Sequence, residues 1–197
     1  DGLRPSWQEV LERFKQEAPD LIGIGAVVST AYAYVKKLCA NLKEILPETK
    51  ILLGGNLAAS AELLHRFAQV DLCVIGEGEK VIVNLAHYFT QQQGLEPDFE
   101  KLARIKGITY LNPSREMIFT GYEAAIPAQE LMDPDWSILE KSSNIENFIG
   151  DPVSREDFAQ DPRSRQPHRA GKRMATVVTT KGCVSRCTFC HRWDRGF

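Results

Sequence analysis

The sequence predicts an α/β protein that opens with a doubly wound parallel sheet of the Rossmann or flavodoxin type. Short apolar runs alternate, over the first 95 residues, with segments whose apolar residues recur at helical spacing. This alternation is typical of parallel strands joined by helices. Two of the apolar runs end at glycine turns, Gly54-Gly55 and Gly76-Glu77-Gly78-Glu79. After residue 94 the pattern changes to a hairpin signal, a long polar stretch and a β-branched run followed by clustered cysteines.

Each element of the sheet has its own signal. Ser6-x-x-Glu9 is a helix-capping pattern, and the apolar run that begins at Leu21 contains glycines, as in a strand buried on both faces. Pro47 ends the helix that follows this strand. In chain order we expect a helix over 6–18, a strand over 21–28, a helix over 35–46, a strand over 50–53, a helix over 63–67, a strand over 71–75 and a helix over 79–92.

The chain is expected to divide into three parts. Residues 1–95 would form the α/β domain. Residues 96–174 would contain a small β-hairpin, with strands over 107–111 and 116–120, and then a connector rich in Pro, Asp, Ser and Arg. Residues 175–197 would begin a second domain with a strand that runs into the cysteines.

Composition excludes several classes of protein. The formal net charge is -2, and the basic stretch over 163–173 lacks interleaved aromatics, so nucleic-acid binding is not expected. No run of about 18 apolar residues suits a membrane span, and no secretory signal is recognisable. Cys39 and Cys73 lie in apolar segments and are expected to be buried thiols. The odd number and clustering of the five cysteines favour a reducing cytoplasm over a disulfide framework.

Three cysteines form the strongest site signal. Cys183, Cys187 and Cys190 fall within eight residues after a predicted strand. Thiolates are soft donors, and three of them can hold one face of a cubane iron–sulfur cluster while leaving its fourth iron open. Zinc bound with the help of His191 is the alternative, although structural zinc sites normally use two separated ligand pairs.

The cysteine motif C-x3-C-x2-C, with Phe189 before the last cysteine, resembles that of the radical S-adenosylmethionine (radical SAM) superfamily. This resemblance implies that Cys183, Cys187 and Cys190 bind a 4Fe-4S cluster after the first strand of a (β/α) barrel. It also implies that the open iron binds S-adenosylmethionine, whose cleavage gives a 5′-deoxyadenosyl radical, and that Phe189 lies beside the adenine.

The first 95 residues resemble the cobalamin-binding domain that precedes the barrel in one subgroup of that superfamily. The similar segments run from Pro19 to Ile24, from Leu52 to Asn56 and from Asp71 to Glu79. The family's first strand, helix and second strand are not recognisable upstream of residue 6. The resemblance implies that cobalamin contacts come from the turns at the sheet edge, namely Ser29, Thr30, Gly54, Gly55, Gly76, Glu77 and Gly78. The histidine motif D-x-H-x-x-G is absent, and His65 is expected at the surface or at a boundary.

The predicted function is that of a cobalamin-dependent radical SAM enzyme acting at an unactivated carbon of a small molecule, by methyl transfer, cyclisation or rearrangement. An external one-electron reductant of the flavodoxin or ferredoxin type is the expected partner. No catalytic side chain is assigned. Because the chain starts at Asp1 and ends at Phe197, we expect a piece of a longer protein that is inactive alone. The alternatives are a non-catalytic cobalamin-binding module and a zinc-binding interaction protein.

Overall fold

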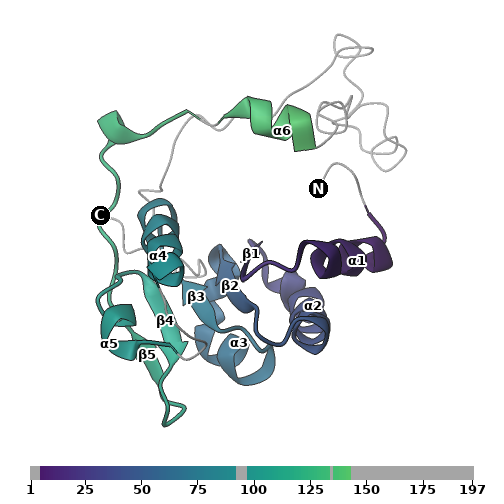
Figure 1. Cartoon of the computed structure of the whole chain (residues 1–197). Helices are drawn as coiled ribbons and strands as arrows, with labels where there is room; N and C mark the ends of the chain where they lie inside the picture. The colour runs from purple at the N-terminus through teal and green to yellow at the C-terminus, as the bar shows by residue number, and fades with distance from the viewer. Residues whose placement is uncertain (1–4, 92–96, 134, 143–197) are drawn as a thin grey trace, which may run out of the picture. The chain divides into compact units, whose positions relative to one another are not determined.

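The computed structural model describes residues 5–91, 97–133 and 135–142 (Figure 1). Within them, residues 7–130 belong to one compact unit that contains all the strands described. The described residues from Leu131 onward, including helix α6 (Trp136–Ser142), belong to a second unit and are considered by themselves. The expected strand and cysteine motif of 175–197 lie outside the described residues.

The sheet has five strands in the order β1-β2-β3-β4-β5 (Figure 1). Strands β1 (Leu21–Gly25), β2 (Lys50–Gly54) and β3 (Leu72–Val74) are parallel, as predicted. Strands β4 (Ile108–Leu111) and β5 (Met117–Phe119) form the predicted hairpin. The sequence did not predict that β4 pairs antiparallel with β3, so that the hairpin extends the same sheet.

The helices confirm the alternation that was read from the sequence. They are α1 (Trp7–Glu17), α2 (Tyr32–Ile45), α3 (Ala61–Phe67), α4 (Glu79–Gln91) and α5 (Phe99–Leu102), the last of which was not predicted. Short 3₁₀ helices η1 (Ser29–Ala31), η2 (Asn56–Ser60) and η3 (Ala128–Glu130) lie between larger elements. Strand β1 ends at Gly25, earlier than predicted, because Val27 and Val28 leave the sheet and are exposed. Within the described part of the chain, no helix is long and apolar enough to span a bilayer.

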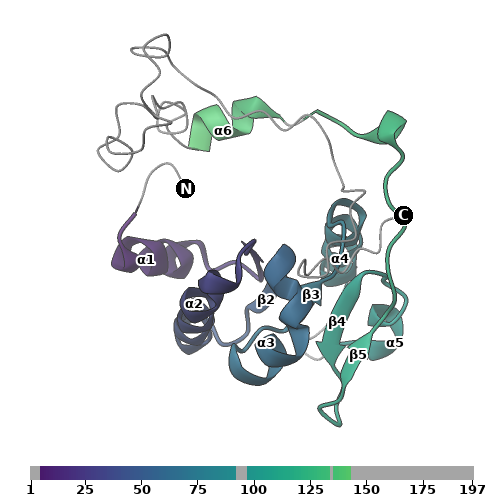
Figure 2. The same ribbon diagram turned by 180° about the vertical axis from the view of Figure 1, so that it is seen from behind.

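Two apolar cores lie on opposite faces of the sheet, as a doubly wound fold requires. Figures 1 and 2 show the sheet and its helices from two opposite sides. Successive residues of a strand point to opposite faces, so Ile51 and Leu53 join one core and Leu52 joins the other. The first core is covered by α1, α2 and α3, and the second by α4 and α5.

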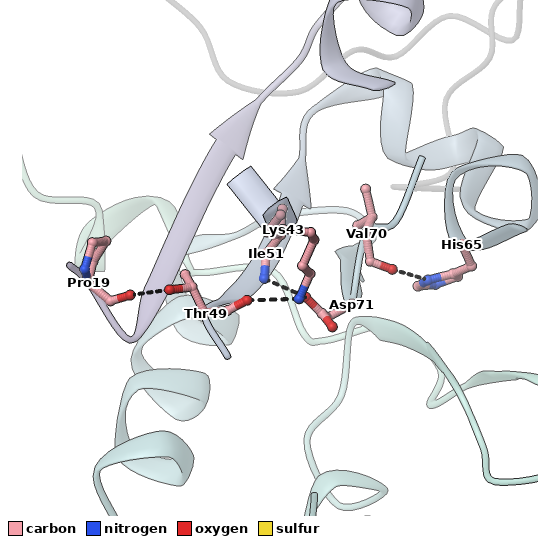
Figure 3. A network of polar contacts seen from close by, with 7 residues as sticks. All are labelled: Pro19, Lys43, Thr49, Ile51, His65, Val70 and Asp71. Carbon is pink, nitrogen blue, oxygen red and sulfur yellow. Dashed lines mark hydrogen bonds and ion pairs between the residues drawn. The ribbon is translucent and has the colours of Figure 1, made fainter. Parts of the chain in front are cut away.

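A polar network fixes the amino-terminal ends of the parallel strands (Figure 3). The Asp71 carboxylate accepts a hydrogen bond of 2.7 Å from the Ile51 N–H and lies 2.7 Å from the Lys43 ammonium. That ammonium also donates to the Thr49 carbonyl, and the Thr49 hydroxyl donates to the carbonyl of Pro19. These contacts tie α2, β2 and the start of β3 together at the edge opposite the glycine turns.

The prediction that His65 lies at the surface or a boundary is wrong. Its side chain is 5% exposed, and its ring nitrogens lie 2.9 Å from the Val70 carbonyl and 3.0 Å from the Thr109 hydroxyl. A carbonyl can only accept, so Nδ1 carries the proton and Nε2 accepts from the hydroxyl. Because burial disfavours the imidazolium, the pKa of His65 lies below its usual value. His65 therefore links α3 to the hairpin strand β4.

Candidate cofactor-binding edge

Three turns meet at the carboxyl-terminal edge of the parallel strands. They follow β1, β2 and β3 and, together with Gly54 at the end of β2, contain all the residues for which the resemblance implied cobalamin contacts. Backbone hydrogen bonds join the first two turns: the Ala26 N–H donates to Gly54 and the Leu57 N–H donates to Ala26, at 2.9 and 3.0 Å. Ser29 and Thr30, in the exposed 3₁₀ turn η1, therefore lie in the turn next to Gly54 and Gly55.

Gly55 is required by the packing of these two turns. Its φ is +85°, in the region that favours glycine, and a Cβ atom here would lie 2.5 Å from the Ala26 carbonyl oxygen. Since the opposing atoms belong to the backbone, they cannot rotate away. The sequence suggested that this glycine admits a ligand, but its first role is to let the two turns touch.

Gly54 differs from its neighbour because the space beside it is open. A Cβ atom on Gly54 would meet only the Val74 Cβ, at 3.9 Å, which is an ordinary contact. Gly23 and Gly25 on β1 have nothing within 4 Å of the corresponding position, and both are exposed. By strand register, Gly25 lies beside Gly54 and Gly23 beside Leu52, so these glycines share the face that carries α4. They form a strip without side chains, here called the glycine strip (Gly23, Gly25 and Gly54).

The third turn connects β3 to α4 through Gly76, Glu77 and Gly78. Gly76 has a φ of +87°, which favours glycine. The Ile82 N–H donates to the Gly78 carbonyl, so the first turn of α4 is joined to this loop at the sheet edge. The preceding Ile75 N–H donates to Gly107, which ties the turn to the start of β4.

The hairpin adds residues to this edge that the sequence did not predict. Because β4 runs antiparallel to β3, its first residues lie beside the end of β3, and β5 returns to the same edge. The Gly107 N–H donates to Gly121 at 2.7 Å, and Tyr122 follows directly. The signal available in the sequence was Gly121, which comes just after the strand. In the structure its φ is +84°, a value that favours glycine.

The two isolated cysteines are confirmed as buried thiols. Cys39 and Cys73 are both fully buried and unpaired. Burial raises the pKa of Cys39 to about 11 and that of Cys73 to about 12, so both are neutral. Among the residues that the structure describes, no group of three or more His, Cys, Asp or Glu side chains is placed to hold a metal ion. Cys183, Cys187, Cys190 and Phe189 lie outside that part, and their roles stay predictions.

Part of the chain that carries this edge matches a family of known proteins. Residues 2–86 match the family model of the B12 binding domain. The fold agrees, since the chain is similar to a solved structure of the cobalamin-dependent S-adenosylmethionine radical enzyme OxsB with aqua-cobalamin and S-adenosylmethionine bound. In that comparison the TM-score is 0.51 with 17% sequence identity, over 62% of this chain and 16% of the other.

Two curated relatives extend the similarity beyond the domain. The chain is 26% identical over 190 residues to the anaerobic magnesium-protoporphyrin IX monomethyl ester cyclase of Cereibacter sphaeroides. It is 22% identical over 204 residues to the cytidylyl-2-hydroxyethylphosphonate methyltransferase of Streptomyces wedmorensis. Each match covers 95% of this chain but only 27% and 36% of the respective relative. The chain is thus similar to the B12 binding domain over residues 2–86 and, along most of its length, to part of each of these two enzymes.

Proposed function

We propose that this chain contributes the cobalamin-binding domain and the cluster-binding loop of a cobalamin-dependent radical SAM enzyme. The observation that carries the proposal is the match of residues 2–86 to the B12 binding domain, over a sheet whose carboxyl edge presents open glycines. The reaction would be methyl transfer, cyclisation or rearrangement at an unactivated carbon of a small molecule. The enzyme would work in the cytoplasm with an external one-electron reductant.

The glycine strip supports cobalamin as the ligand of this edge. A flat or extended group can approach a backbone closely only where no Cβ atoms project, and the strip offers three such positions on one face. The exposed Ser29 and Thr30 and the Gly76–Gly78 turn would supply polar contacts at the rim. When bound, cobalamin would supply a cobalt centre able to carry and release an alkyl group. His65 cannot be its axial ligand, because both ring nitrogens are already bonded within the fold.

Cys183, Cys187 and Cys190 would hold the 4Fe-4S cluster, with Phe189 beside bound S-adenosylmethionine. The support is the motif itself, since three thiolates at this spacing leave one iron position for a further ligand. The bound cluster would supply the electron that cleaves S-adenosylmethionine.

Cobalamin binding is tested by filling the glycine strip. Gly54→Ala and Gly25→Ala should fold normally, because the added methyl meets no tight contact. Both should nevertheless weaken the binding of hydroxocobalamin by about tenfold or more, equivalent to about 1.4 kcal/mol. Glu44→Ala, at an exposed position near the opposite end of α2, is the control and should bind as the wild type does. Equal affinity in all four proteins would refute the proposed use of the strip.

The cluster is tested by anaerobic reconstitution of the full chain with iron and sulfide. We expect about four irons per chain in the wild type. Single Cys→Ala changes at 183, 187 and 190 should each lower the iron content and remove the visible charge-transfer absorption. Stoichiometric zinc without iron would instead support a zinc-binding interaction protein. A chain that retains cobalamin but binds neither iron nor zinc would instead support a non-catalytic cobalamin-binding module.

A further inference from the structure

Tyr122 lies at the candidate edge, beside the turn that follows β3. The hydrogen bonds from Ile75 to Gly107 and from Gly107 to Gly121 join the open end of the hairpin to this turn, at 2.8 and 2.7 Å. A Cβ atom placed on Gly76 would lie 3.9 Å from Cδ1 of the Tyr122 ring. The ring therefore faces the space that a side chain on Gly76 would occupy, although the two residues are 46 positions apart in sequence.

The Tyr122 ring is held in position but is left accessible. It packs edge-to-face on Phe119, with 5.1 Å between ring centroids and an interplanar angle of 79°. Phe119 itself packs partly against the core beneath α1, α2 and α3. Even so, 44% of the Tyr122 side chain is exposed. A large aromatic side chain that is fixed from one side and open on the other is typical of a contact surface, because rigid aromatics lose little entropy on binding.

The far end of the same edge is also apolar. Val27 and Val28, in the turn after β1, are 67% and 56% exposed. Between these valines and Tyr122 lie the turns that contain Gly54, Gly55 and Gly76, which add backbone but no side-chain bulk. Exposed apolar groups at both ends of a glycine-lined edge suit a broad ring system that carries methyl groups along its perimeter.

We propose that Tyr122 is a further cofactor-binding residue, whose ring packs against the perimeter of the corrin ring of bound cobalamin. The inference rests on the proposed function of this edge. It assigns a binding role to the hairpin, which lies outside residues 2–86 matched by the B12 binding domain model. The contact is made by the aromatic ring, so the hydroxyl contributes little.

The test is a titration of the full chain with hydroxocobalamin, followed by visible absorption. Tyr122→Ala should weaken binding by about fivefold to tenfold, the size expected for one aromatic contact. Tyr122→Phe should bind within about twofold of the wild type, because the ring is kept. Met117→Ala is the matched control, since Met117 is an exposed residue of the same hairpin on the far end of β5. Affinity in Tyr122→Ala equal to that of the control would overturn the inference.

A second measurement needs no substitution and covers the case in which Tyr122→Ala fails to fold. Tetranitromethane nitrates exposed tyrosines, and the extent at Tyr122 can be read by peptide mass spectrometry. Saturating hydroxocobalamin should protect Tyr122 at least fivefold, and unchanged nitration would overturn the inference. If the wild-type chain retains no cobalamin at all, the proposed function of the edge fails. If cobalamin binds but Tyr122 is neither protected nor needed, only the role of Tyr122 fails.

Discussion

Replacing Gly55 by alanine tests the close approach of the first two turns. The substitution would force an alanine to a φ of +85°, in a backbone region that costs non-glycine residues about 1–3 kcal/mol. The new Cβ would also lie 2.5 Å from the oxygen and 2.9 Å from the carbon of the Ala26 carbonyl. Relief requires the turns to separate, which weakens the Ala26–Gly54 and Leu57–Ala26 hydrogen bonds, each worth about 1 kcal/mol.

We therefore expect Gly55→Ala to lower the free energy of unfolding by about 3 kcal/mol, a large share of the roughly 5–15 kcal/mol of a typical domain. Urea unfolding followed by circular dichroism measures this change. Gly54→Ala is the matched control and should change stability by less than about 1 kcal/mol, because its methyl enters open space and a Gly→Ala change restricts the unfolded chain. A Gly55→Ala protein as stable as this control would refute the reasoning.

Three further predictions follow from the described contacts. The pKa of His65 is lowered in the fold, so its contribution to stability is complete above pH 6.5 and is lost as pH falls below that value. Urea unfolding at pH 7.5 and 5.5 should show this loss in the wild type and less of it in His65→Gln. Asp71→Ala should cost about 2–4 kcal/mol, because it leaves the partly buried Lys43 unpaired. Adding Lys43→Met should recover part of that cost in the same assay. If the two substitutions instead have simply additive effects on the free energy of unfolding, the ion pair does not stabilise the fold. Cys39 and Cys73 should resist iodoacetamide at pH 8 in the native state and react in denaturant, as peptide mass spectrometry can show.

The parallel part of the sheet was predictable because its signals are local. Apolar runs and helical spacing each depend on a few consecutive residues, and a right-handed crossover leaves few ways to arrange them. The hairpin has a local signal in Asn112-Pro113-Ser114-Arg115, residue types that favour a turn between its two predicted strands. The structure confirms the turn with a hydrogen bond from the Asn112 N–H to the Glu116 carbonyl. Its pairing with β3 is non-local, and nothing in the spacing of residues indicated it.

His65 shows how a correct helix can be assigned the wrong buried face. In the helix predicted over 63–67, the strongest apolar signal comes from Leu63, Leu64 and Phe67. The buried positions are instead Ala61, Leu64, His65 and Ala68, at spacings of three, four and seven, while Leu63 and Phe67 are exposed. Two small alanines carried less hydrophobic signal than a leucine and a phenylalanine, although they mark the face that packs.

The glycines of the candidate edge looked alike in the sequence and differ in the structure. Gly54 and Gly55 are adjacent, but only Gly55 has a positive φ and a backbone neighbour that excludes a side chain. That difference depends on the loop after β1, which is 29 residues away at Ala26. Sequence motifs could therefore locate the edge but could not say which glycine serves the fold and which leaves room for a ligand.

The pairing of the hairpin with β3 has a practical consequence for how this domain can be shortened. A chain cut after α4 would keep every residue that matches the B12 binding domain, yet it would remove β4, one of the two strands that pair with β3. The apolar segment Leu72-Cys73-Val74 would then offer unpaired backbone groups along an open strand, the usual starting point for aggregation. His65 would lose the Thr109 hydroxyl at the same time. A well-behaved minimal domain should therefore extend at least to Gly121, where the last backbone bond to the hairpin is made.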